Sequence, residues 1–180
     1  MWLFLLKCIY FLLPAGLANM APVLMKFWFK GLAQPIDGGQ TWQGQPLFGR
    51  SKTWRGLIFA TLFGIIIFGL QQYLYRFQGI KDISLFNYNQ YNLWLGFLMG
   101  LGAILGDLAK SFFKRRLKMA PGHVWIPLDQ IDYSIGALLL SALIYWPGWS
   151  VTITCILIGF ILHLLINLIG YAIKLKKNKL

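Results

Sequence analysis

Three aspartates in one stretch of the chain are spaced so that they can share a cation. Asp107 ends an apolar, glycine-rich run, and Asp129 and Asp132 open the next apolar run after a basic segment. An i, i+3 spacing puts two side chains on one face of a helix. Neighbouring carboxylates repel one another unless a cation lies between them, and Mg²⁺ prefers carboxylate and phosphate oxygens. The spacing therefore predicts a Mg²⁺ site formed by Asp107, Asp129 and Asp132.

Each of these carboxylates also has a purely structural interpretation. Lys110 follows Asp107 at i+3, so a salt bridge within one helix would satisfy the aspartate at the membrane boundary. Asp129 and Asp132 lie where a helix is expected to begin, and negative charge stabilises a helix N-terminus. The sequence leaves both interpretations open beside the metal site.

Acidic residues are scarce in this chain, so their positions carry information. The chain has five aspartates, no glutamate and 17 lysines and arginines, which gives a net charge of +12. Asp37 lies between Pro-Ile and Gly-Gly, where it would support a metal or a nucleotide, or simply form an Asx turn. Asp82 lies beside Lys81 and has no expected role.

Basic residues suited to phosphate gather in two loops near these aspartates. The loop at 34–56 contains five glycines, which let the backbone approach a ligand closely. Ser111 and Lys114 follow Asp107 at i+4 and i+7, so a helix would place all three on one face. An ordinary basic loop that follows membrane topology is the alternative for both regions. The candidate phosphate-binding residues are Lys52, Arg55, Lys114 and Arg115, and His123 is either a loop residue or a contact to phosphate or base.

The elements that must position these residues are membrane helices. The chain is 58% hydrophobic, and residues 56–75, 83–106 and 133–173 contain no charged side chain. A helix that crosses a bilayer needs roughly 20 apolar residues, so the third run is long enough for two spans, with a turn at residues 146–149. Residues 1–25 are also apolar, and Lys7 inside them favours a retained span over a cleaved signal peptide. The sequence predicts an all-α integral membrane protein of about five transmembrane helices.

Charge predicts how these helices are oriented. Most lysines and arginines lie in alternate loops and in the C-terminal tail, and the positive-inside rule makes those segments cytoplasmic. The N-terminus is then outside and the C-terminus cytoplasmic, with cytoplasmic loops near 27–55 and 113–131. Because topology accounts for the basic residues, a nucleic-acid partner is not expected. One domain covers residues 1–180, and a homo-oligomer is an open alternative.

Small and polar residues inside the expected spans predict helix packing. The GxxxG spacings at residues 96–100 and 102–106 are typical of closely packed membrane helices. Cys8 and Cys155 are expected to be buried packing residues without a disulfide. His163, Asn167 and Tyr171, spaced i, i+4, i+8, form a polar stripe for which hydrogen bonding between helices is favoured over ligand contact.

Taken together, the motifs resemble the CDP-archaeol synthase family over nearly the whole chain. The segments that carry the resemblance are PIDGG (35–39), GRSKTWRG (49–56), GDLAKS (106–111), KRR (114–116), PG (121–122) and DQID (129–132). The chain is similar, more distantly, to CDP-diacylglycerol synthases, whose Lys-Asp pair has no counterpart here because no acid lies between Asp107 and Asp129. The number of metal ions therefore stays open.

The resemblance implies a Mg²⁺-dependent cytidylyltransferase of five spans in phospholipid biosynthesis. It would join CTP to an archaeal-type lipid phosphate and release pyrophosphate, in the cell (inner) membrane, with the active site facing the cytoplasm. Asp107, Asp129 and Asp132 would bind metal, Lys114 would act in catalysis, and Lys52, Arg55, Arg115, Asp37 and His123 would bind the nucleotide. Phosphatidic acid as the acceptor is one alternative, and a small membrane transporter without enzyme activity is another.

Overall fold

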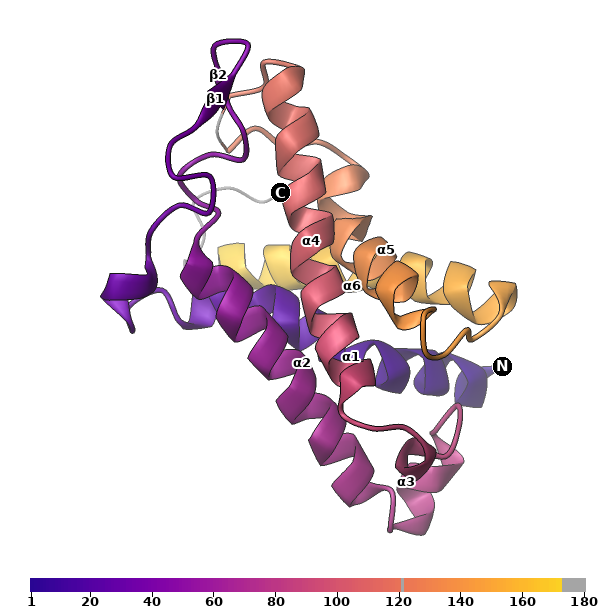
Figure 1. Cartoon of the computed structure of the whole chain (residues 1–180). Coiled ribbons are helices and arrows are strands. Elements are labelled where there is room, and N and C mark those ends of the chain that lie inside the picture. Colours follow the sequence, from indigo (N-terminus) through magenta and orange to yellow (C-terminus); the bar gives the residue numbers. More distant parts are fainter. Residues whose placement is uncertain (121, 173–180) are drawn as a thin grey trace.

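The computed structural model describes residues 1–120 and 122–172, and the side chains of these residues up to Leu168. Long helices dominate this part of the chain, and a small hairpin lies beside the end of one of them (Figure 1). The elements are α1 (Trp2–Leu24), η1 (Lys30–Leu32), β1 (Thr41–Trp42), β2 (Gln45–Pro46), α2 (Trp54–Leu74), α3 (Gln78–Asp82), η2 (Tyr88–Gln90), α4 (Trp94–Arg116), α5 (Leu128–Ser141) and α6 (Trp149–Ala172). The prediction of an all-helical membrane protein is confirmed.

Four helices of the described chain, α1, α2, α4 and α6, are long and apolar enough to cross a membrane. The predicted pair of helices around the turn at 146–149 is present as α5 and α6. However, α5 has 14 residues, which rise about 21 Å, against a hydrocarbon core of about 30 Å. That the chain crosses the membrane five times therefore stays a prediction, and so do the sides on which its termini lie.

Glycines allow α4 to pack closely against α2 and α5. A Cβ atom on Gly64 of α2 would overlap the carbonyl of Gly96, and one on Gly102 of α4 would overlap the carbonyl of Gly136 in α5. A Cβ atom on Gly106 would overlap the carbonyl of Asp132. These contacts explain the two GxxxG spacings, and α4 and α5 lie side by side in Figure 1. The first turns of α5 are thereby held against the end of α4.

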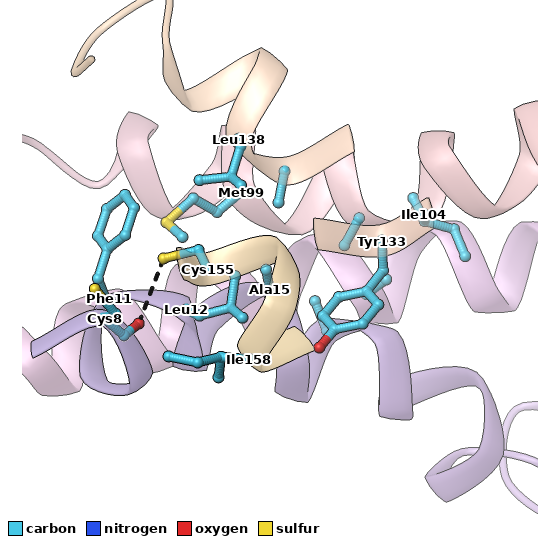
Figure 2. Packing of buried hydrophobic residues seen from close by; sticks show 14 of the residues in the cluster. Cys8, Phe11, Leu12, Ala15, Met99, Ile104, Tyr133, Leu138, Cys155 and Ile158 are labelled. Atoms are coloured by element: carbon cyan, nitrogen blue, oxygen red, sulfur yellow. Dashed lines mark hydrogen bonds between the residues drawn. The ribbon is translucent and has the colours of Figure 1, made fainter. Parts of the chain in front are cut away.

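The core lies where α1 and α6 pack against α4 and α5. Phe11 and Leu12 of α1 meet Met99 of α4 and Leu138 of α5 in one buried cluster (Figure 2). Cys8 and Cys155 are buried and free, as predicted. The Cys155 thiol donates to the Cys8 carbonyl at 3.7 Å and so links α6 to α1.

The loop between α1 and α2 is folded, although its composition predicted only a glycine-rich connection. Its ends pair as an antiparallel bridge, with the Ile36 amide donating to the Lys52 carbonyl at 2.8 Å and the Trp54 amide to the Gln34 carbonyl at 3.0 Å. Strands β1 and β2 form a hairpin within it. The second loop is shorter than the predicted 113–131, because α4 continues through Arg116 and α5 begins at Leu128.

Candidate active site

Three aspartates from two helices converge on the ammonium group of Lys110. Its nitrogen lies 3.0 Å from Asp107, 3.1 Å from Asp129 and 2.7 Å from Asp132. Asp107 and Lys110 lie on one face of α4, and the close packing at Gly106 brings the start of α5 against that face. The salt bridge from Asp107 to Lys110 that the spacing allowed is present, and it is one part of a larger cluster.

Two further lysines surround this cluster. Lys52, from the end of the folded loop, lies 2.5 Å from the second oxygen of Asp107. Lys114, one turn after Lys110 and nearly buried, donates to both oxygens of Asp129 at 3.0 and 3.1 Å and to the His123 carbonyl. Asp129 also accepts from the Trp125 amide at 2.6 Å, just before α5. Three positive and three negative side chains therefore share one partly buried site.

The cluster presents carboxylate oxygens, the type of ligand that a hard divalent cation prefers. The position of the Lys110 nitrogen shows that one cation can lie within 3.1 Å of three carboxylates, and oxygen ligands of this kind are those that Mg²⁺ prefers. In the described residues, no three His, Cys, Asp or Glu side chains are by themselves grouped as a metal site. Lys110 would therefore have to move aside for a metal to bind these oxygens.

A polar cavity of about 590 Å³ opens beside the cluster. The folded loop contributes one wall, through residues 46 and 48–52, and α4 contributes the opposite wall. The charged and hydroxyl side chains that line it are Arg50, Ser51, Lys52, Lys110, Ser111, Lys114, Arg115 and Asp129. Because its lining has five cationic side chains and one acidic side chain, this cavity suits a polyanion such as a nucleoside triphosphate.

Asp37 shapes the wall of this cavity instead of joining the acidic cluster. Its carboxylate accepts hydrogen bonds from the amides of Gly39, Phe48 and Gly49, each at 3.0 Å. Burial alone would raise the pKa of Asp37, but the three backbone donors outweigh it and hold the pKa below its usual value. Gly38 and Gly39 have φ values of 55° and 81°, which suit glycine in such a turn. Asp37 thus supports the wall of the polar cavity indirectly, through the backbone of Phe48 and Gly49.

Arg116 connects the hairpin to the end of α4 through hydrogen bonds. Its guanidinium donates to the carbonyls of Trp42 at 2.6 Å, Gln45 at 3.0 Å and Pro46 at 2.7 Å. It also lies 5.4 Å from the ring of Trp42 and 5.2 Å from the ring of Phe112. Figure 1 shows the hairpin beside that end of α4. Since Pro46 lines the polar cavity, Arg116 positions part of its wall.

Two of the predicted nucleotide-binding residues lie elsewhere than expected. Arg55 donates to the carbonyls of Lys26 at 2.8 Å and Trp28 at 3.1 Å, so it holds the chain that leaves α1. The His123 ring is exposed and contacts the carbonyl of Val124 at 3.0 Å, while its own carbonyl binds Lys114. Their roles in nucleotide binding stay predictions, and the geometry favours Lys52, Lys114 and Arg115.

The polar stripe on α6 lies apart from the charged cluster. His163 and Asn167 are 3.3 Å apart and border an apolar groove between α1 and α6. This contact lies within α6, so the predicted hydrogen bonding between helices stays a prediction. The side chain of Tyr171, the third predicted member, falls outside the described side chains.

Sequence reasoning left Lys110 and Arg116 out of the predicted site. The i, i+3 spacing of Lys110 from Asp107 was a signal, but it indicated only a local ion pair. Arg116 belongs to the KRR motif, but its contact with the hairpin gave no signal, because its partners are backbone carbonyls about seventy residues earlier in the chain. The resulting arrangement has the charges suited to a polyphosphate and to neutralising charge that develops during phosphoryl chemistry, and its carboxylates are of the type that a divalent cation prefers.

Comparisons with known proteins agree on one family. A family model described as "CarS-like: CDP-archaeol synthase" matches residues 1–179. The CDP-archaeol synthase of Pyrococcus furiosus is 32% identical, covering 96% of each chain, and that of Methanopyrus kandleri is 37% identical, covering 98% of this chain and 94% of the relative. A solved structure of an intramembrane enzyme for archaeal membrane lipids biosynthesis is similar with a TM-score of 0.68 and 31% identity, covering 91% of this chain and 94% of that one.

Proposed function

The chain belongs to the CDP-archaeol synthase family, and on this basis we propose that it transfers the cytidylyl group of CTP to an archaeal-type lipid phosphate. The acceptor is 2,3-di-O-geranylgeranylglyceryl phosphate, and pyrophosphate is released. The observation that carries the proposal is the basic cavity of about 590 Å³ that shares Lys110 and Asp129 with the acidic cluster. Such a cavity at the end of membrane helices suits a nucleotide that reacts with a lipid headgroup.

The triphosphate of CTP binds in the polar cavity. Lys52 and Lys114 already neutralise carboxylates on the two sides of the cluster, and their ammonium groups face the same space as Arg115. Arg115 lines this cavity, and the guanidinium of an arginine binds phosphate through charge-assisted hydrogen bonds.

The chemical step is an in-line displacement at phosphorus. An oxygen of the lipid phosphate forms a bond to the α-phosphorus, and the bond from that phosphorus to the oxygen bridging to the β-phosphate breaks. The electron pair of that bond leaves with pyrophosphate. A phosphate monoester dianion is nucleophilic without a general base, so catalysis rests on positioning and on stabilising charge. Lys52, Lys114 and Arg115 stabilise charge on the pentacoordinate transition state and on the departing pyrophosphate.

Mg²⁺ is part of this proposal, with Asp107, Asp129 and Asp132 as its protein ligands. The support is that all three carboxylates already face one cation, the ammonium of Lys110. When bound, the metal would supply positive charge to the phosphate oxygens, in the way that metals do in other phosphoryl transfers. The chain's own lysines provide charge neutralisation beside it.

The site is proposed to face the cytoplasm from the cell membrane. The basic loop at residues 49–55 and the end of α4 form the site together, and positive residues of this kind favour the cytoplasmic side. CTP and Mg²⁺ are available there. A homo-oligomer stays a prediction.

Pyrophosphate release tests the activity and the choice of lipid. Purified protein is incubated with CTP and Mg²⁺ and with either the geranylgeranyl ether phosphate or phosphatidic acid. We expect release with the ether lipid, and a clearly lower kcat/KM with phosphatidic acid. A preference for phosphatidic acid would move the substrate to the diacyl class, and no release with either lipid would favour a membrane protein without this activity.

A further inference from the structure

An exposed segment directly after α1 takes no part in the site described above. Every residue from Lys26 to Leu32 is exposed, and the large apolar side chains among them, Phe27, Trp28, Phe29 and Leu32, have exposed fractions of 78%, 66%, 56% and 38%. Figure 1 shows the short helix η1 of this segment outside the helix bundle and away from the hairpin. A contiguous apolar patch of this kind marks a contact with a partner, a ligand or a membrane.

The backbone of this segment is held by contacts with α2. Arg55, in the first turn of α2, donates to the carbonyls of Lys26 at 2.8 Å and Trp28 at 3.1 Å. Phe29 has a left-handed backbone with a φ of 50°, which is uncommon for a bulky residue. Its ring packs against the ring of Phe59 in α2, with centroids 4.8 Å apart. The exposed rings are therefore presented from a chain whose path α2 fixes.

The position of the segment indicates that the membrane surface covers it. Helix α1 is long and apolar enough to cross a membrane and ends at Leu24, so the segment that follows lies where a span meets water. The indole of Trp28 suits this boundary, because it combines an apolar ring with a polar N–H group. Phe27 and Leu32 would lie among the first carbons of the lipid chains.

Charge shows which lipids this surface fits. Lys26 and Lys30 flank the aromatic rings, and residues 26–36 contain no acid. In the described structure neither lysine forms a salt bridge. Anionic lipids attract lysines that lie near the membrane surface. A second copy of the chain docked here around a two-fold axis would bring more lysines and no acid, so lipid is the favoured occupant.

We propose that residues 26–32 form a membrane-interface anchor, in which the apolar side chains enter the bilayer surface and Lys26 and Lys30 bind the phosphate groups of anionic lipids. The anchor is tied through Arg55 to the start of α2, three residues after Lys52 of the polar cavity. It therefore fixes how far the folded loop lies from the membrane surface. This interaction is independent of the cytidylyl transfer proposed above.

A reporter at Gly31 tests whether the anchor lies in the membrane surface. A Cβ atom on Gly31 meets nothing within 4 Å, so Gly31→Cys can carry a nitroxide label while every ring and lysine of the anchor stays in place. Cys8 and Cys155 are buried, and the unmodified protein corrects for any labelling there. The protein is studied in vesicles of phosphatidylcholine and phosphatidylglycerol.

Relaxation of the label by oxygen, which dissolves in the bilayer, is compared with relaxation by a water-soluble nickel chelate. Gln40→Cys, at an exposed residue of the folded loop, is the control. We expect the ratio of oxygen to nickel relaxation to be at least about threefold higher at residue 31 than at residue 40, because only the anchor enters the bilayer surface.

Recognition of lipid charge is tested with a fluorophore on the same cysteine at residue 31. Phosphatidylglycerol and phosphatidylcholine, each with a nitroxide near the headgroup, are compared as quenchers. We expect half-maximal quenching at a roughly fivefold lower fraction of the anionic lipid for each lysine of the anchor. Lys26→Gln combined with Lys30→Gln should abolish this preference. Lys118→Gln, at an exposed residue near the end of α4, should keep it.

Two results would overturn the proposal. One is a label at residue 31 that is as accessible to the nickel chelate as the label at residue 40, and the other is equal quenching by both lipids before any lysine is replaced. Dipolar broadening between the labels of two copies would also contradict it, because a second chain would then cover the segment. None of these readouts uses CTP, so failure of the anchor is distinguishable from failure of the proposed function.

Discussion

At the scale of single residues, the contacts of Lys110 distinguish the acidic cluster from a local ion pair. If Lys110 contacted only Asp107, the pair would be an ordinary salt bridge within one helix, as the i, i+3 spacing allowed. The same ammonium group also contacts Asp129 and Asp132 from another helix, and local spacing does not require that. Three acids from a total of five are thus gathered at one point of the chain, beside a basic cavity. This concentration of charge is costly near a membrane and indicates function.

Asp107→Asn tests whether these carboxylates bind a metal. The change removes a charged oxygen but keeps the size of the side chain, so turnover of CTP should fall at least about 100-fold while the helix content stays unchanged. Binding of Mn²⁺, followed by electron paramagnetic resonance in the absence of nucleotide, should weaken in parallel. Asp82→Asn is the matched control, since Asp82 is exposed on α3 and bonds only to Gln78 in the described structure.

The two readouts separate a metal ligand from a structural ion pair. A structural role would lower thermal stability and leave the affinity for Mn²⁺ as it was. Normal turnover and normal Mn²⁺ binding in Asp107→Asn would show that the carboxylate assignment is wrong.

At the scale of elements, the helices were predictable from the sequence and the folded loop was not. Charge-free runs and the turn at 146–149 located the long helices, because hydrocarbon requires long apolar segments. The GxxxG spacings indicated close packing, but only the structure shows that Gly106 lies against the carbonyl of Asp132. The hairpin depends on carbonyl contacts to Arg116 across many intervening residues, and local propensity contains no signal for such contacts.

Arg116→Ala tests the role of the hairpin as a wall of the nucleotide cavity. Loss of three charged hydrogen bonds should loosen the hairpin and raise the KM for CTP about tenfold. The KM for the lipid phosphate should stay within twofold, because the hydrogen bonds of Arg116 in the described structure go to the hairpin and not to the carboxylate cluster. Steady-state kinetics with each substrate varied in turn provides the measurement.

Lys118→Ala is the control for charge in this experiment. Lys118 is exposed near the same end of α4, so this variant loses the same charge without disturbing the hairpin. An equal effect of both changes on CTP would show that Arg116 acts through general electrostatics and not by holding the hairpin. Arg116→Lys should recover part of the affinity, because a lysine keeps the charge but not the planar fork.

At the scale of the whole molecule, the fold gathers the charged cluster where the last turns of α4 meet the start of α5. The helix α4 is the central element, since it packs on α2 and α5 through glycines and contributes Asp107, Lys110 and Lys114. An apolar groove between α4 and α5 and the polar cavity are both lined by Lys110 of that helix. This arrangement accounts for how one small chain can bring together a water-soluble nucleotide and a lipid.

The family and the class of fold followed from sequence, whereas the apolar grooves between the helices did not. The motifs that resemble CDP-archaeol synthases lie at the site and cover nearly the whole chain. Apolar residues that line a groove are indistinguishable in sequence from apolar residues that face bulk lipid. The difference between them depends on how α4 and α5 are packed, which the order of residues does not specify locally.

The most direct test of cytidylyl transfer follows the phosphorus atoms of CTP. Purified protein in detergent or lipid vesicles is given the geranylgeranyl ether phosphate, Mg²⁺ and CTP labelled with ³²P at either the α- or the γ-position. Attack at the α-phosphorus predicts that α-label passes into the lipid extract and γ-label appears as pyrophosphate. Transfer of γ-label to the lipid, or CTP consumption without any labelled lipid, would contradict the account.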